Sequence, residues 1–163
     1  MIDSETVVGT GLRITVAKDE LAAKLAIVAR GVSTRTTVLV LGGIQLRAEG
    51  SQLHLAATDM EVSLRAVVDA QVASEGTVVV PGRLLLDIAR SLSEGEVSIE
   101  HHPDEAVVVV SAGAATYRLH TYSSEDFPRL PEVDTDALHT VDRDALVETV
   151  ARVGRSASRG GAD

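Results

Sequence analysis

A chain of 163 residues is long enough for one full domain and part of another. It contains no cysteine, which excludes a disulfide scaffold and a thiolate metal site. Its net charge of −9 argues against a protein that is basic all over and binds nucleic acid with its whole surface, although a local basic patch would still attract a polyanion.

The composition also indicates the kind of core and the compartment. Hydrophobic residues make up 45% of the chain and aromatic residues only 2%, so the core has to be built from Val, Leu, Ile and Ala. No apolar run approaches the roughly 18 residues that span a bilayer, and the N-terminus lacks the pattern of a signal peptide. We expect a cytoplasmic protein without membrane contact.

The first half of the chain predicts a strand, a helix and three further strands. Residues 1–11 are polar, contain glycine and are expected to be disordered. Apolar and polar residues alternate over 12–17, which indicates a half-buried strand. Acidic residues then open a helix over 19–30, whose apolar stripe comprises Leu21, Leu25 and Val28. Three strand-like runs separated by turns follow, at residues 39–47, 52–57 and 61–68.

The second half repeats this order. A β-branched run ends at Pro81, whose missing N–H is tolerated at the start of the helix predicted over 82–92. Arg83 and Arg90 lie seven residues apart on one side of this helix, with Asp87 between them. The apolar stripe on its other side comprises Leu85, Ile88, Ala89 and Leu92. Three strand-like runs again follow, at residues 96–101, 106–111 and 115–122.

The two halves together predict a duplicated fold. Each half reads as β-α-β-β-β, and two such halves give an α+β domain with two helices packed on one side of antiparallel sheets. Residues 123–136 hold two prolines and a cluster of acids, which is typical of a linker. A strand over 138–141 and a helix over 143–155 then open a further unit that the chain does not complete.

Five motifs, in this order and spacing, resemble the bacterial DNA polymerase III beta subunit, the replicative sliding clamp. They are Arg35-Thr36-Thr37, Leu41-Gly42-Gly43-Ile44, Ala57-Thr58-Asp59-Met60-Glu61, Val80-Pro81-Gly82-Arg83-Leu84-Leu85-Leu86-Asp87-Ile88 and Glu125-Asp126-Phe127-Pro128. The resemblance implies the DNA-clamp fold, with clamp domain 1 over residues 12–127 and a linker over 128–136. Residues 137–163 would then be the strand and helix that begin domain 2.

The resemblance implies a processivity factor of DNA replication that is not itself an enzyme and carries no cofactor. In the family, each chain has three such domains, and two chains close head to tail into a ring around double-stranded DNA. The helices line the hole, and the partners of the full-length family are the replicative polymerase, which the ring tethers, and a clamp loader. Such a protein works in the cytoplasm, at the nucleoid.

The resemblance implies that seven residues at matching positions contact DNA: Arg35, Arg83, Arg90, Arg152, Arg155, Ser158 and Arg159. The alternative for each arginine is a solvated surface charge. The resemblance also implies that Tyr117 and Leu119, two residues apart on the last strand of the first domain, lie at the subunit interface. Their alternative is simple core packing.

The chain departs from the family at two places. Thr36 and Leu39 stand where prolines are often found, and the chain ends where the sheet of the second domain should begin. The partner-binding groove between the second and third domains then has no counterpart here. We therefore expect a fragment, an expression product or a truncated gene model, with a monomeric or interfering form of the clamp as a further hypothesis.

A second class of function is a dimeric helix-on-sheet enzyme that acts on a small acyl or nucleotide substrate. It predicts a deep pocket with a perturbed carboxylate or histidine beneath a helix, whereas a clamp predicts two shallow helices with arginines outward. His101 and His102 are neighbours on a strand and point to opposite faces, so they do not converge on one metal ion. Asp59 and Glu61 flank a turn without a nearby His or Lys, so we expect no catalytic site there.

Overall fold

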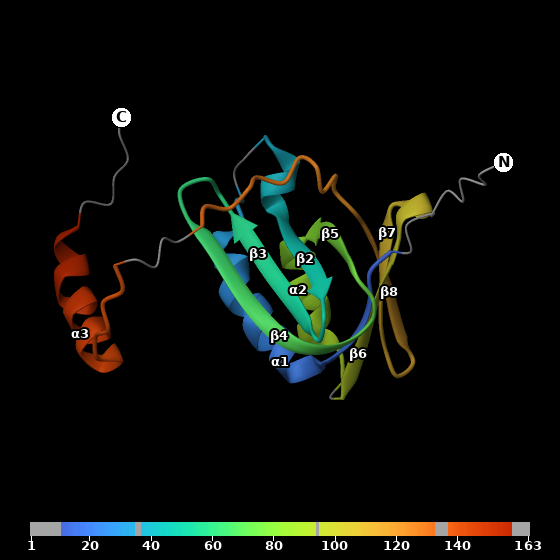
Figure 1. Ribbon diagram of the computed structural model, residues 1–163, viewed down its shortest axis with the longest axis horizontal. Coiled ribbons are helices and arrows are strands. Elements are labelled where there is room, and N and C mark those ends of the chain that lie inside the picture. Colours follow the sequence, from blue (N-terminus) through green and yellow to red (C-terminus); the bar gives the residue numbers. More distant parts are fainter. Residues whose placement is uncertain (1–10, 35–36, 94, 133–136, 158–163) are drawn as a thin grey trace. The chain divides into compact units, whose positions relative to one another are not determined.

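The structure, a computed structural model, describes residues 11–34, 37–93, 95–132 and 137–157 (Figure 1). The chain divides into two compact units, Met1–Pro131 and Glu132–Asp163. The described part of the first unit contains eight strands, two α-helices and three 3-10 helices. In chain order they are β1 (Arg13–Ala17), α1 (Lys18–Val28), η1 (Ala29–Gly31), η2 (Leu39–Gly42), β2 (Gly43–Glu49), β3 (Gln52–Thr58), β4 (Ser63–Ser74), β5 (Gly76–Pro81), α2 (Gly82–Ser91), β6 (Glu96–His102), η3 (Pro103–Glu105), β7 (Val107–Ala112) and β8 (Ala115–His120).

Helix α1 follows β1 directly, as the pattern predicts. Ile14 and Val16 of β1 are buried, which is the expected alternation of a strand with one face on the core. Asp19 and Glu20 occupy the first turn of α1, where the positive end of the helix dipole favours carboxylates. The buried stripe of α1 is the predicted one, with Leu21, Leu25 and Val28.

Pro81 separates β5 from α2 in the same way. The helix begins at Gly82, one residue after the proline, and ends at Ser91, whose hydroxyl donates to the carbonyl oxygen of Ile88 at 2.8 Å. The predicted stripe is buried, and Leu92 is buried just beyond the end of the helix. Both strand-to-helix openings of the first unit are therefore confirmed.

The sheet topology shows why the sequence reads as two equivalent halves. All ladders are antiparallel, in the order β5-β2-β3-β4-β1-β6-β7-β8. Strand β1 lies between β4, the last strand of its own half, and β6, the first strand after the other helix. Strand β5 pairs with β2 of the other half, and an isolated bridge from Val79 to Tyr122 ties it to the chain just beyond β8. The opening strand of each half thus pairs with a strand of the other half as well as with its own, which confirms the duplicated α+β fold.

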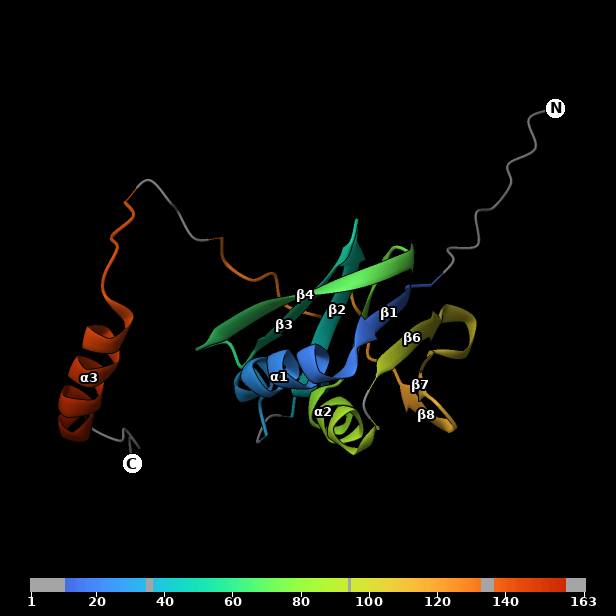
Figure 2. The same ribbon diagram turned by 90° about the horizontal axis from the view of Figure 1, so that it is seen from below.

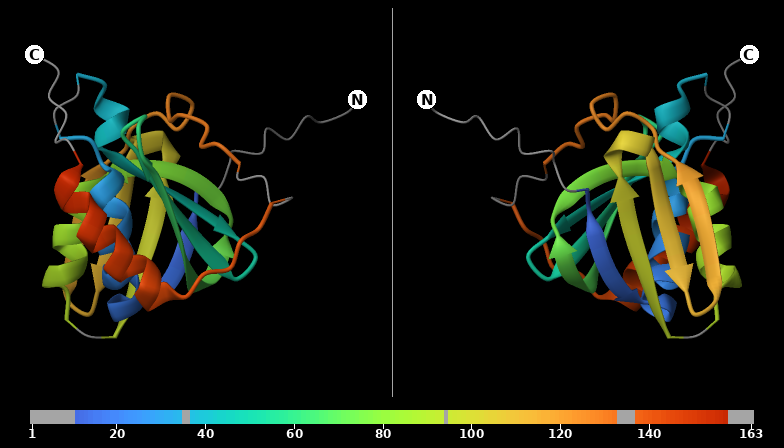
Figure 3. Two further views of the ribbon diagram at one scale, coloured as in Figure 1. Left: turned by 90° about the vertical axis from the view of Figure 1, so that its left-hand side faces the viewer. Right: turned by 90° about the vertical axis from the view of Figure 1, so that its right-hand side faces the viewer.

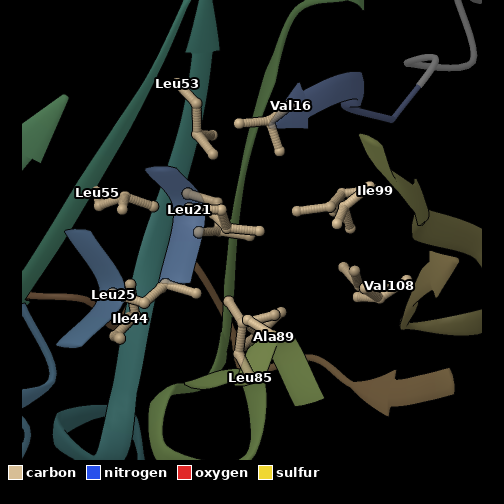
Figure 4. Close-up of a cluster of buried hydrophobic side chains, with 14 of the residues drawn as sticks. Val16, Leu21, Leu25, Ile44, Leu53, Leu55, Leu85, Ala89, Ile99 and Val108 are labelled. Carbon is tan, nitrogen blue, oxygen red and sulfur yellow. The ribbon is translucent and has the colours of Figure 1, made fainter. Parts of the chain in front are cut away.

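Both helices pack on the same side of the strands. Figure 2 shows α1 and α2 next to each other below the sheet, and the two helices contact each other directly. The right-hand view of Figure 3 shows β1, β6, β7 and β8 side by side, from blue to orange. The core between helices and strands is aliphatic, as the composition requires. Side chains from both halves point toward one another in Figure 4, among them Val16, Leu21, Leu25, Ile44, Leu53, Leu55, Leu85, Ala89, Ile99 and Val108.

Two strands differ from the sequence prediction. The run over 39–47 does not start as a strand, because Leu39–Gly42 forms the 3-10 helix η2. This turn buries the neighbours Val40 and Leu41 together, whereas a strand would point them to opposite faces. Strand β4 is longer than the predicted 61–68, because its first part pairs with β3 and its last part with β1.

The described part of the second unit contains helix α3 (Arg143–Val153) and the short 3-10 helix η4 (Gly154–Ser156). Asp142 caps α3, since its Oδ1 accepts from the backbone N–H of Ala145 at 2.8 Å. The strand predicted over 138–141 is not formed. A strand needs a ladder partner, and the described residues of this unit include no other strand. No helix in the described ranges is long and apolar enough to cross a membrane.

Candidate nucleic-acid interface

A shallow groove of about 310 Å³ lies between α1 and α2 on the helix side of the first unit. It is lined by Ala26, Ala29, Arg30, Arg83, Leu86, Asp87 and Arg90. Small and apolar side chains contribute part of its lining, and three arginines and one aspartate contribute the rest. The formal charge of the lining is therefore positive although the chain as a whole is acidic.

The second helix supplies two of these arginines. Arg83 and Arg90 are both exposed and stand seven residues apart, about two helical turns, so they project from the same side of α2. Leu85, Ile88 and Ala89 are buried on the other side of α2, which fixes the direction of the arginines. Leu86 is also buried, and it lies between Arg83 and Arg90 in the lining of the groove. The predicted outward placement of Arg83 and Arg90 agrees with the structure.

Arg30 lies in η1, just after α1, and lines the groove with the other two arginines. Its position in the sequence does not single it out, because the pair Arg30-Gly31 looks like an ordinary helix end. A signal was present in the spacing: Ala26, Ala29 and Arg30 follow the i, i+3, i+4 rule on a face apart from the buried stripe. Only the contact between α1 and α2 shows that this face meets Arg83 and Arg90.

None of the groove arginines forms an ion pair with a described residue. The ion pairs and side-chain hydrogen bonds found in the described ranges leave out Arg30, Arg83 and Arg90. By contrast, Arg13 pairs with Glu100 at 3.6 Å on the strand side. An arginine without a carboxylate partner keeps its five N–H donors for an external anion.

The other predicted DNA contacts belong to the second unit or lie outside the described residues. Arg152 on α3 donates to Glu148 one turn earlier, and Arg155 is exposed in η4. Arg35, Ser158 and Arg159 lie outside the described residues, as does most of the segment 1–11.

The predicted interface residues Tyr117 and Leu119 lie on β8, at one end of the strand order. The Tyr117 side chain is partly accessible, with 36% of the residue exposed, and its hydroxyl lies 3.4 Å from Oγ of Ser91 at the end of α2. Leu119 is only 1% exposed and belongs to the core. A chain that paired with β8 would therefore contact its backbone and Tyr117, whereas Leu119 would stay in the core behind them.

The titratable groups with shifted pKa values lie away from the groove. Two backbone N–H groups, of Val62 and Glu61, donate to the Asp59 carboxylate in the turn after β3, and they lower the pKa of this exposed group. Burial lowers the pKa of His101 on β6, with a smaller contribution from the neighbouring His102. Neither Asp59 nor His101 lines the groove. In the described ranges, no cluster of three or more possible metal ligands occurs.

Comparisons with known proteins agree on one family. Residues 12–131 match the family described as DNA polymerase III beta subunit, N-terminal domain. The chain is 39% identical over 148 residues to a beta sliding clamp of Streptomyces coelicolor, covering 91% of this chain and 39% of the relative. A beta sliding clamp of Micrococcus luteus is 37% identical over 148 residues, covering 91% of this chain and 47% of the relative. The solved DNA polymerase III subunit beta of Pseudomonas aeruginosa superposes with a TM-score of 0.79 at 32% identity, over 86% of this chain and 38% of that one.

Proposed function

We propose, from the premise that this chain belongs to the DNA polymerase III beta subunit family, that it supplies the first domain of a sliding clamp for DNA replication. The clamp encircles duplex DNA, holds its phosphates without sequence preference and tethers the replicative polymerase. The observation that carries the proposal is the groove between the two helices, with three arginines that form no ion pair with a described residue.

The groove suits a protein that must slide. Contacts to phosphates carry no sequence information, and base contacts would stop the protein at particular sites. The lining of the groove is net positive, whereas the chain carries −9. A local positive field attracts the DNA backbone, and the acidic remainder limits unwanted adhesion elsewhere on the surface.

The enzyme alternative has less support. It requires a deep pocket with a perturbed acid or base beneath a helix. Asp59 lies in an exposed turn. His101 lines a separate hollow of about 560 Å³, but β1, β4, β6 and η3 form that hollow and no described α-helix contributes to it. The relatives reported above carry clamp names. We therefore assign a binding role, as an accessory subunit of the polymerase, and no active site to this chain.

The chain spans 39% of the length of the Streptomyces coelicolor relative, so the properties of the whole clamp are part of the proposal. We assign domain 1 to residues 12–127, the linker to 128–136 and the start of domain 2 to 137–163. The two-chain ring, with Tyr117 at its interface and Leu119 behind it in the core, and the partnership with a clamp loader belong to the full-length clamp. Its place of action is the cytoplasm, at the nucleoid.

The test is the salt dependence of DNA binding. Fluorescence anisotropy of a labelled, mixed-sequence duplex is measured with the chain at several salt concentrations. The double variant Arg83→Ala, Arg90→Ala is expected to lower the slope of log K against log salt by about two, since each lost phosphate contact contributes about 0.9. Arg30→Ala alone should lower it by about one.

The matched control changes two exposed arginines away from the groove, Arg47 and Arg129, to alanine. Both double variants remove the same charge, so a general electrostatic effect would weaken the DNA binding of both variants equally. Equal losses, or no binding by the unchanged chain at low salt, would contradict the proposal.

A further inference from the structure

The segment Thr121–Pro131, here called the strap, does not leave the first unit when β8 ends. It crosses the strands on the side opposite the helices (the orange segment after β8 in Figure 1). The alternation within β5 shows which side this is: Val78 and Val80 face the main core, and Val79 between them faces the strap. The first residues of the predicted linker, 128–131, therefore belong to a segment that is packed on the domain.

The start of the strap is held by the backbone. The Thr121 N–H donates to the carbonyl oxygen of Ala106 at 3.0 Å, and the Tyr122 N–H donates to the carbonyl oxygen of Val79 at 2.8 Å. These bonds continue the sheet for two residues and give this end the stability of a ladder.

The middle of the strap is held by a small apolar cluster. Phe127, the one phenylalanine of the chain, is 7% exposed and packs with Val40, Ala56 and Val79. This cluster is separate from the main core. Tyr122 and Leu130 cover its edges and stay half-buried.

The end of the strap is held by one side chain. Nη2 of Arg65, on β4, donates to the carbonyl oxygens of Leu130 and Pro131, both at 3.1 Å. Arg65 stands opposite Ala56 in the ladder between β3 and β4, so its stem lies beside the small cluster. Pro131 has no N–H to give to a neighbouring strand, so its carbonyl is the backbone group left to hold it.

We propose that Arg65 is a latch that holds the strap closed, and that the strap opens as a local unit while the sheet stays folded. The physical basis is the uneven strength of its attachments. The main core fixes the sheet, whereas a few side chains and one exposed guanidinium fix the far end of the strap. Because the second unit begins at Glu132, the latch also fixes where the chain leaves the first unit. This inference does not depend on DNA binding.

Trypsin cleavage of the full chain tests the latch. The Arg129–Leu130 bond lies within the strap, and the Arg155–Ser156 bond in the exposed η4 serves as an internal reference. Arg65→Ala is expected to speed cleavage at Arg129 about tenfold relative to Arg155, which corresponds to about 1.4 kcal/mol in the opening equilibrium. Hydrogen exchange at the Phe127 amide should accelerate in parallel.

Arg47→Ala is the control, because Arg47 lies on β2, which β3 separates from β4, and it pairs with Glu49 instead of the strap. It should leave the cleavage ratio unchanged. Arg65→Lys keeps a charged donor and should give a ratio between those of the unchanged chain and Arg65→Ala. If Arg65→Ala does not fold, Arg65→Lys alone decides the question. Faster cleavage at Arg129 relative to Arg155 in that variant supports the latch. An unchanged ratio, or parallel acceleration of both bonds, overturns it.

Discussion

Gly43 packs so closely against Val79 that a Cβ atom on the glycine would lie 2.5 Å from Cγ1 of the valine. The same atom would lie 3.0 Å from the carbonyl oxygen of Val40 and 3.1 Å from Cδ2 of Tyr122. Gly43 opens β2, next to β5, and its bare Cα lets Val79 and the strap residue Tyr122 come together there. The absence of a side chain at Gly43 is thus a condition for joining the two halves of the domain.

We predict that Gly43→Ala destabilises the first unit by about 2 kcal/mol, the usual scale for overpacking a tight site. Urea unfolding followed by circular dichroism measures the change. The neighbour Gly42 is the control, since the nearest atom to an added Cβ there is 3.9 Å away, and Gly42→Ala should change stability by less than about 0.5 kcal/mol. Equal losses in both variants would contradict the packing argument.

Asp87 is the one carboxylate in the lining of the arginine groove, and it stands between Arg83 and Arg90 on α2. Asp87→Asn removes a negative charge near the proposed phosphate site, so we predict about threefold tighter DNA binding at low salt. The gain should shrink as salt screens the groove. Asp126→Asn makes the same change on the exposed strap and should have no effect. Weaker binding by Asp87→Asn would show that the groove does not face DNA.

The duplicated fold was predictable because its signals are local. The alternation of apolar and polar residues indicated β1, and the i, i+3, i+4 spacing of apolar residues indicated the buried stripes of α1 and α2. Pro81 indicated the boundary between β5 and α2. The 3-10 turn η2 was missed because Val40 and Leu41 read as part of an apolar strand, and only their joint burial reveals the turn. The pairing of each opening strand with the other half was also beyond sequence reasoning, since it joins residues far apart in the chain.

The candidate site was predictable in part for the same reason. Arg83 and Arg90 share a helix face, so their spacing alone groups them. Arg30 joins them only through the packing of α1 on α2, and the bonds from Arg65 to the strap join residues 65 or more positions apart. Contacts of this kind leave no periodic trace in a single sequence.

His101 gives the first unit a dependence on pH. It is half-buried on β6, and burial, followed by the nearby His102, lowers its pKa below the ordinary value of 6.5. In the unfolded chain the same imidazole regains that ordinary value. Between the two pKa values the unfolded chain therefore binds more protons than the folded one, so stability rises with pH through this window.

We therefore predict that the first unit loses stability as the pH falls below about 6.5, down to the lowered pKa of His101. His101→Gln keeps a polar side chain of similar size without the titration, and it should flatten the curve of unfolding free energy against pH between 7 and 5. His120→Gln, on the exposed side of β8, should leave the slope of the unchanged chain intact. The measurement is urea unfolding at half-unit steps of pH. A slope that persists unchanged in His101→Gln would contradict the assignment of this pH dependence to His101.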